Sequence, residues 1–307
     1  AGFTKHGSLP VPGKPAPAHV PDELFWGHGY EEFALEGDDP YLAISRLHEG
    51  PGMVWSPNVQ FGEPGWVVTR HAYVQEVFGD CRKILNPFFA PARIRELDGS
   101  VKQACESLIA GFEDRGSCEF ISEFGEMFPS HVFLDLMGMP KEKLPDFLEW
   151  ELGMLRESDP VKRGQAMLAV LEYMEDFVQE QKKNPTTQLL KGMVTARYND
   201  ERPLDDGELL GMCFLFYIGG LDTVYSVLGW IFRYLAGDQA LQERLRTNPD
   251  DLPRAIEEFL RAFGVAAPTR RARNDHVFHG VWIKAGDLVK PSTPAAVRCA
   301  GSFTPFR

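Results

Sequence analysis

The sequence predicts a mainly α-helical protein with a small β component near each end of the chain. Between residues 92 and 263, apolar residues recur at helical spacing in segments that proline or glycine separates. Runs of β-branched and aromatic residues, which are typical of strands, occur instead before residue 70 and after residue 275. No repeat of fixed period links the helical segments, so a solenoid is not expected.

The expected elements follow in chain order. A lead-in rich in proline and glycine covers residues 1–21, and Asp38 and Asp39 are placed to cap a first short helix. The expected helices are Asp39–Glu49, Ala72–Phe78, Ala92–Arg115, Ile121–Met137, Leu144–Glu157, Arg163–Lys183, Asp206–Ala236, Asp238–Thr247 and Leu252–Phe263. The expected strands are Met53–Trp55, Gly65–Thr69, His276–Ile283 and Asp287–Val289, with a turn at Lys284–Gly286 between the last two.

The composition disfavours several classes of protein. Of the 307 residues, 44% are hydrophobic and 25% are charged, which is ordinary globular usage. The formal net charge of −12 repels a phosphate backbone and an anionic membrane surface, so we expect no nucleic-acid partner and no membrane partner. The five cysteines form no C-x-x-C pair, which disfavours a disulfide framework and a zinc site and is consistent with the reducing cytoplasm.

The segment Leu209–Ala236 is long and apolar enough to cross a bilayer. An ionised Asp222 at its centre would cost about 2.5–3.5 kcal/mol on insertion scales. A helix that is apolar on nearly all sides is also typical of the centre of a large helical domain. We therefore expect a buried central helix rather than a membrane span.

The motif Gly219-Gly220-Leu221-Asp222-Thr223 lies in the middle of this helix. Two glycines inside a helix cost about 1 kcal/mol each relative to alanine, which indicates close backbone approach or local distortion. Thr223 can donate its hydroxyl to the carbonyl of Gly219, and the Asp222 carboxylate beside it is suited to proton delivery. The alternative is close helix packing at the glycines, with Asp222 paired to a distant arginine. The residues alone leave both interpretations open.

Two further patterns follow along the chain. Glu258 and Arg261 lie three residues apart, so they share a helix face and can form an ion pair. Arg270 belongs to a dense basic cluster at residues 269–273 of an acidic chain. Such a cluster is either a solvated turn or a clamp for a carboxylate or phosphate, which the planar guanidinium fits well.

Other signatures are absent from the sequence. It contains no G-x-S-x-G, P-loop, H-E-x-x-H or G-x-G-x-x-G motif, and its eight histidines form no ligand pair at helical spacing. No metal site built from protein side chains is therefore predicted.

In this order the motifs resemble the cytochrome P450 family. The glycine-rich motif in the long helix is similar to the family's oxygen-activation motif, and EFLR (Glu258 to Arg261) is similar to its Glu-x-x-Arg motif. Arg270 corresponds to the arginine that binds a haem propionate. The segments LNPFFAP (Leu85 to Pro91) and Phe120 to Pro140 are similar to bacterial soluble members of the camphor-hydroxylase type.

The resemblance implies a P450-like helical domain over residues 22–289 that holds haem. It implies that Asp222 and Thr223 are the catalytic pair that delivers protons to bound oxygen. It implies haem contacts from Gly219, Gly220 and Arg270, and a structural role for Glu258 with Arg261. The implied activity is a monooxygenase that hydroxylates a small apolar substrate, such as a terpenoid, with O2 and electrons from a ferredoxin-type partner in the cytoplasm.

The sequence departs from the family's pattern at two places. The family's haem-ligating cysteine loop is not identifiable, because Cys299 lacks the expected preceding Phe and Gly and follows Arg261 too soon. Between Gly79 and Lys83, a loop and helix expected of the family are missing, and residues 290–307 form an atypical tail. We therefore expect an incomplete member, through truncation, a frame error or a gene fragment.

The alternative function is a non-enzymatic helical scaffold, or a binder of apolar ligands, that keeps the topology without haem. A third class, an all-α enzyme of the terpene-cyclase type, needs an aspartate-rich metal motif on facing helices. The sequence contains no such motif.

Overall fold

The structure, a computed structural model, describes residues 16–30, 44, 46–60, 62–78, 94–198 and 202–296. The chain divides into two compact units. Unit 1 combines Ala1–Gly79 with Leu235–Arg307, and unit 2 is the continuous stretch Asp80–Tyr234. The predictions for the lead-in up to residue 15, the helix start at Asp39, the junction Gly79–Lys83, the segment Leu85–Pro91 and Cys299 lie outside the described residues.

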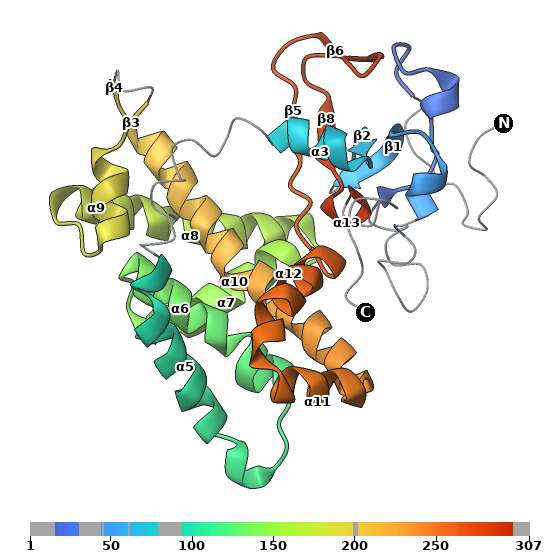
Figure 1. Cartoon of the computed structure of the whole chain (residues 1–307). Coiled ribbons are helices and arrows are strands. Elements are labelled where there is room, and N and C mark those ends of the chain that lie inside the picture. Colours follow the sequence, from blue (N-terminus) through green and yellow to red (C-terminus); the bar gives the residue numbers. More distant parts are fainter. Residues whose placement is uncertain are drawn as a thin grey trace. The chain divides into compact units, whose positions relative to one another are not determined.

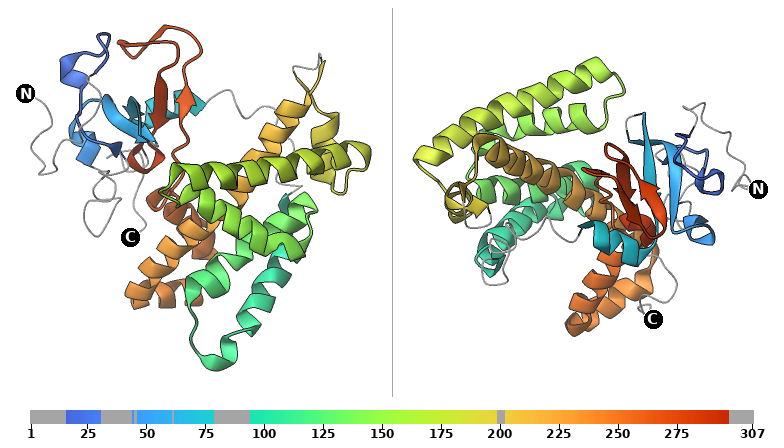
Figure 2. Two further views of the ribbon diagram at one scale, coloured as in Figure 1. Left: turned by 180° about the vertical axis from the view of Figure 1, so that it is seen from behind. Right: turned by 90° about the horizontal axis from the view of Figure 1, so that it is seen from above.

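Unit 2 is helical (Figure 1). Its elements are α5 (Asp98–Ala110), η4 (Glu113–Arg115), the π-helical turn η5 (Ile121–Gly125), α6 (Met127–Met137), η6 (Lys141–Lys143), α7 (Leu144–Leu155), α8 (Pro160–Lys183), α9 (Gln188–Thr195), the two-residue strands β3 (Arg197–Tyr198) and β4 (Arg202–Pro203), and most of α10 (Asp206–Gly237). Figure 2 shows α7 and α8 side by side from two further directions. The mainly α fold class is confirmed.

Local chemistry explains where these helices begin and end. Asp159 accepts a hydrogen bond from the backbone N–H of Val161 at 2.8 Å, so α8 begins at Pro160, before the predicted start at Arg163. Thr187 caps α9, which the sequence patterns missed, by accepting from the N–H of Leu190. Gly138 ends α6 with φ of 60°, a conformation that glycine adopts without the steric cost of a Cβ.

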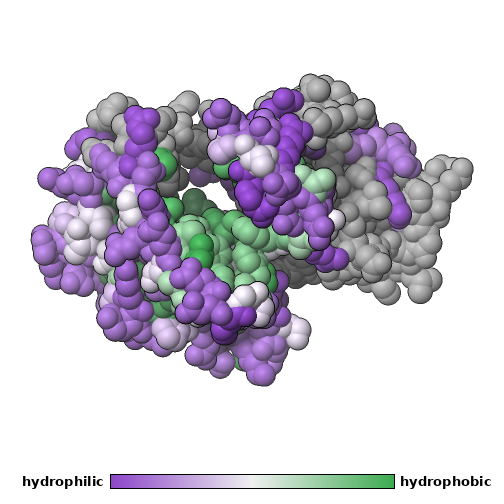
Figure 3. All heavy atoms as spheres, turned by 60° about the horizontal axis from the view of Figure 1, so that its bottom comes forward, coloured by the Kyte–Doolittle hydropathy of each residue, from purple (hydrophilic) through white to green (hydrophobic). Residues whose placement is uncertain are grey.

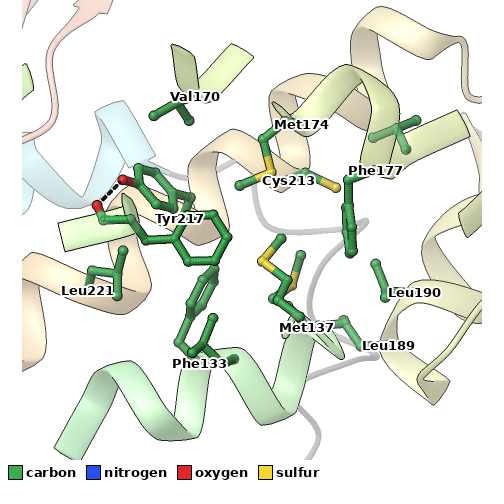
Figure 4. Packing of buried hydrophobic residues seen from close by; sticks show 14 of the residues in the cluster. Phe133, Met137, Val170, Met174, Phe177, Leu189, Leu190, Cys213, Tyr217 and Leu221 are labelled. Carbon is green, nitrogen blue, oxygen red and sulfur yellow. Dashed lines mark hydrogen bonds between the residues drawn. The ribbon is translucent and has the colours of Figure 1, made fainter. Parts of the chain in front are cut away.

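The core of unit 2 lies between α6, α7, α8, α9 and α10. On α10 it takes every fourth residue, with Leu209, Cys213, Tyr217 and Leu221 each at most 2% exposed. Tyr217 donates its hydroxyl to the backbone carbonyl of Phe147 at 2.5 Å, a bond that Figure 4 shows among packed methionine and leucine side chains. This bond satisfies a buried hydroxyl and fixes α10 against α7.

The sequence predicts a buried central helix, and α10 is buried along one side only. Leu215, opposite the buried row, is 58% exposed, and Gly219 one turn further on is also exposed. Within the described residues, α10 is the one helix long and apolar enough to cross a membrane, and 17% of its most apolar window is buried. Composition could not reveal this asymmetry, because both faces of the helix are apolar.

Unit 1 contains a four-stranded sheet of order β1-β2-β8-β5. Its strands are β1 (Met53–Gln60), β2 (Glu63–Val68), β5 (Arg270–Arg271) and β8 (Leu288–Pro291). Strands β2 and β8 pair in parallel from Gly65 opposite Leu288 to Val68 opposite Pro291. A Cβ on Gly65 would lie 2.5 Å from the carbonyl oxygen of Leu288, so glycine permits this close approach.

The remaining elements of unit 1 are η1 (Asp22–Leu24), η2 (Arg46–Glu49), α3 (His71–Phe78), α11 (Gln239–Thr247), η7 (Pro249–Asp251), α12 (Leu252–Ala262), α13 (Thr293–Ala296) and the hairpin strands β6 (His276–Phe278) and β7 (Val281–Ile283). The prediction of one strand over His276–Ile283 is wrong. His279 and Gly280 have φ of 47° and 82°, which turns the chain back as a tight hairpin.

Part of the predicted tail is folded into unit 1. Strand β8 ends at Pro291, and the backbone N–H of Ser292 donates to the carbonyl of Val68 at 2.8 Å. Ala295 and Ala296 of α13 are at most 1% exposed. The described residues 290–296 therefore belong to the core of this unit, while the predicted domain boundaries stay a prediction.

Candidate functional site

The two glycines in the middle of α10 have different surroundings. A Cβ on Gly220 would lie 2.5 Å from Cδ2 of Phe133 on α6, so Gly220 allows the two helices to pack closely. A Cβ on Gly219 would meet nothing within 4 Å. The packing interpretation therefore holds for Gly220, while Gly219 presents bare backbone to an open space.

That open space is an apolar cavity of about 480 Å³. Its walls come from α5, α6 and α10 and contain no charged residue: Val101, Phe128, Pro129, Val132, Phe133, Leu136, Leu215, Phe216, Gly219, Gly220 and Val224. Figure 3 shows a hollow coloured green, for hydrophobic residues, on the face of the molecule that it presents. A cavity of this size and lining suits an apolar or flat, largely apolar ligand.

Thr223 is bonded back to Gly219. Its hydroxyl donates to the carbonyl oxygen of Gly219 at 2.5 Å, which confirms the bond predicted from the sequence. This bond competes with the helical N–H for the same carbonyl. The hydroxyl is thereby held on the side of α10 that carries Gly219, next to the cavity wall.

Asp222 is paired with an arginine from the end of α7. Arg156 donates one guanidinium nitrogen, Nη2, to Oδ1 of Asp222 and to the hydroxyl of Tyr225, both at 2.8 Å. The Asp222 side chain is 24% exposed and that of Arg156 is 56% exposed. The distant arginine partner was one of the two interpretations left open by the sequence. The structure therefore gives the two neighbouring side chains different partners, Arg156 for Asp222 and the Gly219 carbonyl for Thr223.

Sequence reasoning missed Glu151, an acid of the same region. It lies on the inner face of α7, is 3% exposed, and its Oε1 has no hydrogen-bond partner among the described residues. Burial raises its pKa to about 8, the negative charges of Asp222 and Glu126 add to the rise, and Arg156 opposes it. The available signal was its position, since Phe147, Glu151 and Met154 fall on one helix face.

Three of the predicted site residues belong to unit 1. Arg261 donates through Nε and Nη2 to both carboxylate oxygens of Glu258 at 2.6 Å, which confirms the predicted ion pair. The Arg261 hydrogen bond lowers the pKa of Glu258. Arg270 lies on β5, half-buried, and donates to the carbonyl of Thr269 at 3.2 Å. The structure thus brings Gly219, Asp222 and Thr223 together in unit 2 and Glu258 and Arg261 together in unit 1.

Protein ligands for a metal are not gathered anywhere in the described part of the chain. No group of three or more His, Cys, Asp or Glu residues is placed to hold an ion there. On α10, Gly219 borders the apolar cavity, and the hydroxyl of Thr223 is bonded to the carbonyl of that glycine.

Comparison with known proteins identifies the family. The family model Cytochrome P450 matches residues 154–298. The probable cytochrome P450 127A1 of Sinorhizobium fredii is 28% identical over 92% of this chain and 77% of its own, and the vitamin D(3) 25-hydroxylase of Pseudonocardia autotrophica is 25% identical over 90% and 75%. The crystal structure of cytochrome P450 CYP101C1 matches with a TM-score of 0.74 and 27% identity, covering 94% of this chain and 84% of that one.

The chain belongs to the cytochrome P450 family, with bacterial members among its relatives. Members of this family are haem-dependent monooxygenases, and haem is the cofactor expected of this chain. The chain spans about three quarters of the length of the two named relatives.

The described residues fit one face of a haem. The apolar wall and the missing side chain at Gly219 leave room for a flat group against α10. The described residues supply no cysteine thiolate beside that wall to bind the haem iron. None of the described cysteines lines the cavity, and burial raises the pKa of the Cys213 thiol to about 11, so this thiol stays protonated at neutral pH. The remaining candidate from the sequence, Cys299, lies outside the described residues.

Proposed function

We propose that the protein hydroxylates a small apolar substrate, such as a terpenoid, with O2 and electrons from a ferredoxin-type donor in the cytoplasm. The observation that carries this proposal is the open side of Gly219 on an apolar cavity, with the Thr223 hydroxyl held one turn away. A cavity wall without charged groups favours hydrocarbon substrates, because it cannot compensate a polar substrate for its lost hydration. The relatives favour a haem monooxygenase over a non-enzymatic scaffold.

Each predicted site residue then has a role. When bound, haem supplies the activation of molecular oxygen. Gly219 leaves the space that this group needs, and Gly220 holds α10 against α6. Thr223 and Asp222 would hold and move protons at their hydroxyl and carboxyl groups. Arg270 would hold a haem propionate, for which its guanidinium is suited, and the Glu258–Arg261 ion pair would support α12.

Haem uptake tests the proposal directly. Purified protein is mixed with haemin, reduced under carbon monoxide and examined by absorption spectroscopy. We expect uptake with the Soret band of thiolate ligation, and loss of that band in Cys299→Ser identifies the ligand. Failure of the unaltered chain to bind haem would contradict the proposal and favour the scaffold.

A matched pair of glycine variants tests the position of the site. Gly219→Leu places a side chain in the space beside α10 that haem would occupy. The steric conflict should cost about 1–3 kcal/mol of binding free energy, so we expect haem affinity to fall by about tenfold. Gly211→Leu is the control, because Gly211 is also exposed on α10, also has nothing within 4 Å, and does not line the cavity. Equal affinities of the two variants would show that haem binds elsewhere.

A further inference from the structure

Glu151 is a buried acid that the proposed function does not use. Its side chain is 3% exposed, and its Oε1 makes no hydrogen bond within the described residues. If the side chain were ionised, the buried Oε1 would lack the donor that normally compensates its charge. A neutral carboxylic acid costs far less to bury, so the geometry favours a protonated side chain.

The groups around Glu151 come from several elements. Asp222, Tyr217 and Tyr225 belong to α10, Glu126 lies immediately before α6, and Arg156 follows α7. The neighbouring helix α8 contributes apolar residues to the same core. Two carboxylates therefore oppose the ionisation of Glu151 and one arginine favours it, in addition to the dominant effect of burial, and the pKa rises to about 8.

Asp222 needs a source of protons to act in proton delivery. Its carboxylate oxygen Oδ1 accepts a hydrogen bond from Arg156. Arginine is not a proton source, because its guanidinium does not deprotonate in proteins. Tyr225 is a poor source, because burial raises the pKa of its hydroxyl above the usual range. Glu151 is a neighbouring group that holds a proton at neutral pH and can release it.

We propose that Glu151 is the proton store of Asp222. Its buried carboxyl group on α7 holds a proton and passes that proton to the Asp222 carboxylate on α10. Glu151 then regains a proton from water. Glu151 is thus a positioning residue that acts through Asp222. The proposal rests on the proposed function, because the store matters only where Asp222 delivers protons. Its first part, a neutral Glu151 coupled to Asp222, can be measured on the protein without haem.

Infrared spectroscopy on the purified full chain tests the store. Neutral carboxylic acids have a C=O stretching band that carboxylates lack, and subtracting the spectrum of Glu151→Gln isolates the band of Glu151. We expect this band at pH 7 and its disappearance with a midpoint near pH 8. In Asp222→Asn the midpoint should fall by about 0.5–1 pH unit, because one opposing negative charge is removed. Absence of the band at pH 7, or a midpoint that Asp222→Asn leaves unchanged, overturns the proposal.

The pH dependence of unfolding gives a second readout. The pKa of Glu151 in the folded protein, about 8, lies above the ordinary value of 4.5 for a glutamate, so the folded state binds this proton more tightly. The resulting stability is complete below about pH 4.5 and is lost as pH rises toward 8. Across that window the unfolding constant of the unaltered protein should rise relative to Glu151→Gln by up to about tenfold per pH unit.

Glu149→Gln is the matched control, since Glu149 is an exposed acid on the same helix. It should follow the pH dependence of the unaltered protein, whereas an equal response of both variants overturns the store. Failure of haem uptake with the infrared results intact counts against the proposed function alone. Loss of the Glu151 band with haem uptake intact counts against the store alone.

Discussion

The two faces of α10 have similar composition and opposite surroundings. One face packs Leu209, Cys213, Tyr217 and Leu221 into the core of unit 2, with at most 2% of each residue exposed. The other presents Leu215 and Gly219 to the apolar cavity. Apolar residues on a helix therefore serve two purposes here. The packed face stabilises the fold, and the open face offers a surface that no side chain of the described unit fills.

Truncating one leucine on each face is the strongest test of this comparison. Leu221→Ala removes a fully buried side chain and should lower the free energy of unfolding by about 2–5 kcal/mol. Leu215→Ala removes a side chain that is 58% exposed and should change it by about 0.5 kcal/mol or less. Chemical denaturation of both variants measures the difference. Similar losses would show that the open face is also packed in solution.

The adjacent glycines sharpen the comparison at closer range. Gly220→Ala places a methyl group against the Phe133 ring and should destabilise the protein by about 1–3 kcal/mol. Gly219→Ala meets no neighbour and should stabilise it by about 0.5–1 kcal/mol, because alanine is the better helix former. Thermal unfolding of the two variants should therefore shift in opposite directions. Shifts of the same sign would contradict the assignment of one glycine to packing and one to the cavity.

Removing the ion pair of Asp222 should change the free energy of unfolding least among these variants. Arg156→Gln removes the ion pair with Asp222 and should lower the free energy of unfolding by about 1 kcal/mol or less. The effect is small because Arg156 is more than half exposed and water screens the pair. The control is Arg246→Gln on α11, whose pair with Glu243 is 68% and 62% exposed. We expect the control to cost about 0–0.5 kcal/mol. Denaturation at low and high salt measures both, and a larger cost for the control would contradict the special role of Arg156.

Much of the fold could be predicted because local signals decide it. Helical periodicity and proline or glycine breaks indicated the long helices, and the Thr223 bond to Gly219 and the Glu258–Arg261 pair follow from positions four and three residues apart. The elements that were missed or misread depend on backbone geometry. Helix α9 relies on the cap at Thr187, and the β6–β7 hairpin relies on two successive residues with positive φ.

The site was predicted less completely because it depends on contacts between distant segments. Nothing local distinguishes Gly219 from Gly220, and only the position of Phe133 on another helix separates their roles. Glu151 resembles any other acid in an amphipathic helix until α10 is packed against it. Arg156 lies 66 residues from Asp222 in the sequence, so no spacing rule could have paired them.

The parallel pairing of β2 with β8 has a consequence for the order of folding. Trp66 on β2 donates to Asp287, which is 221 residues later in the chain. The carbonyl of Val68 on β2 accepts from the N–H of Ser292, which is also synthesised much later. During synthesis, the continuous helices of unit 2 can therefore form local contacts while the hairpin of β1 and β2 still has an unpaired edge. The sheet of unit 1 can be completed only after β8 has been made, and until then the edge of β2 is open to pairing with another chain.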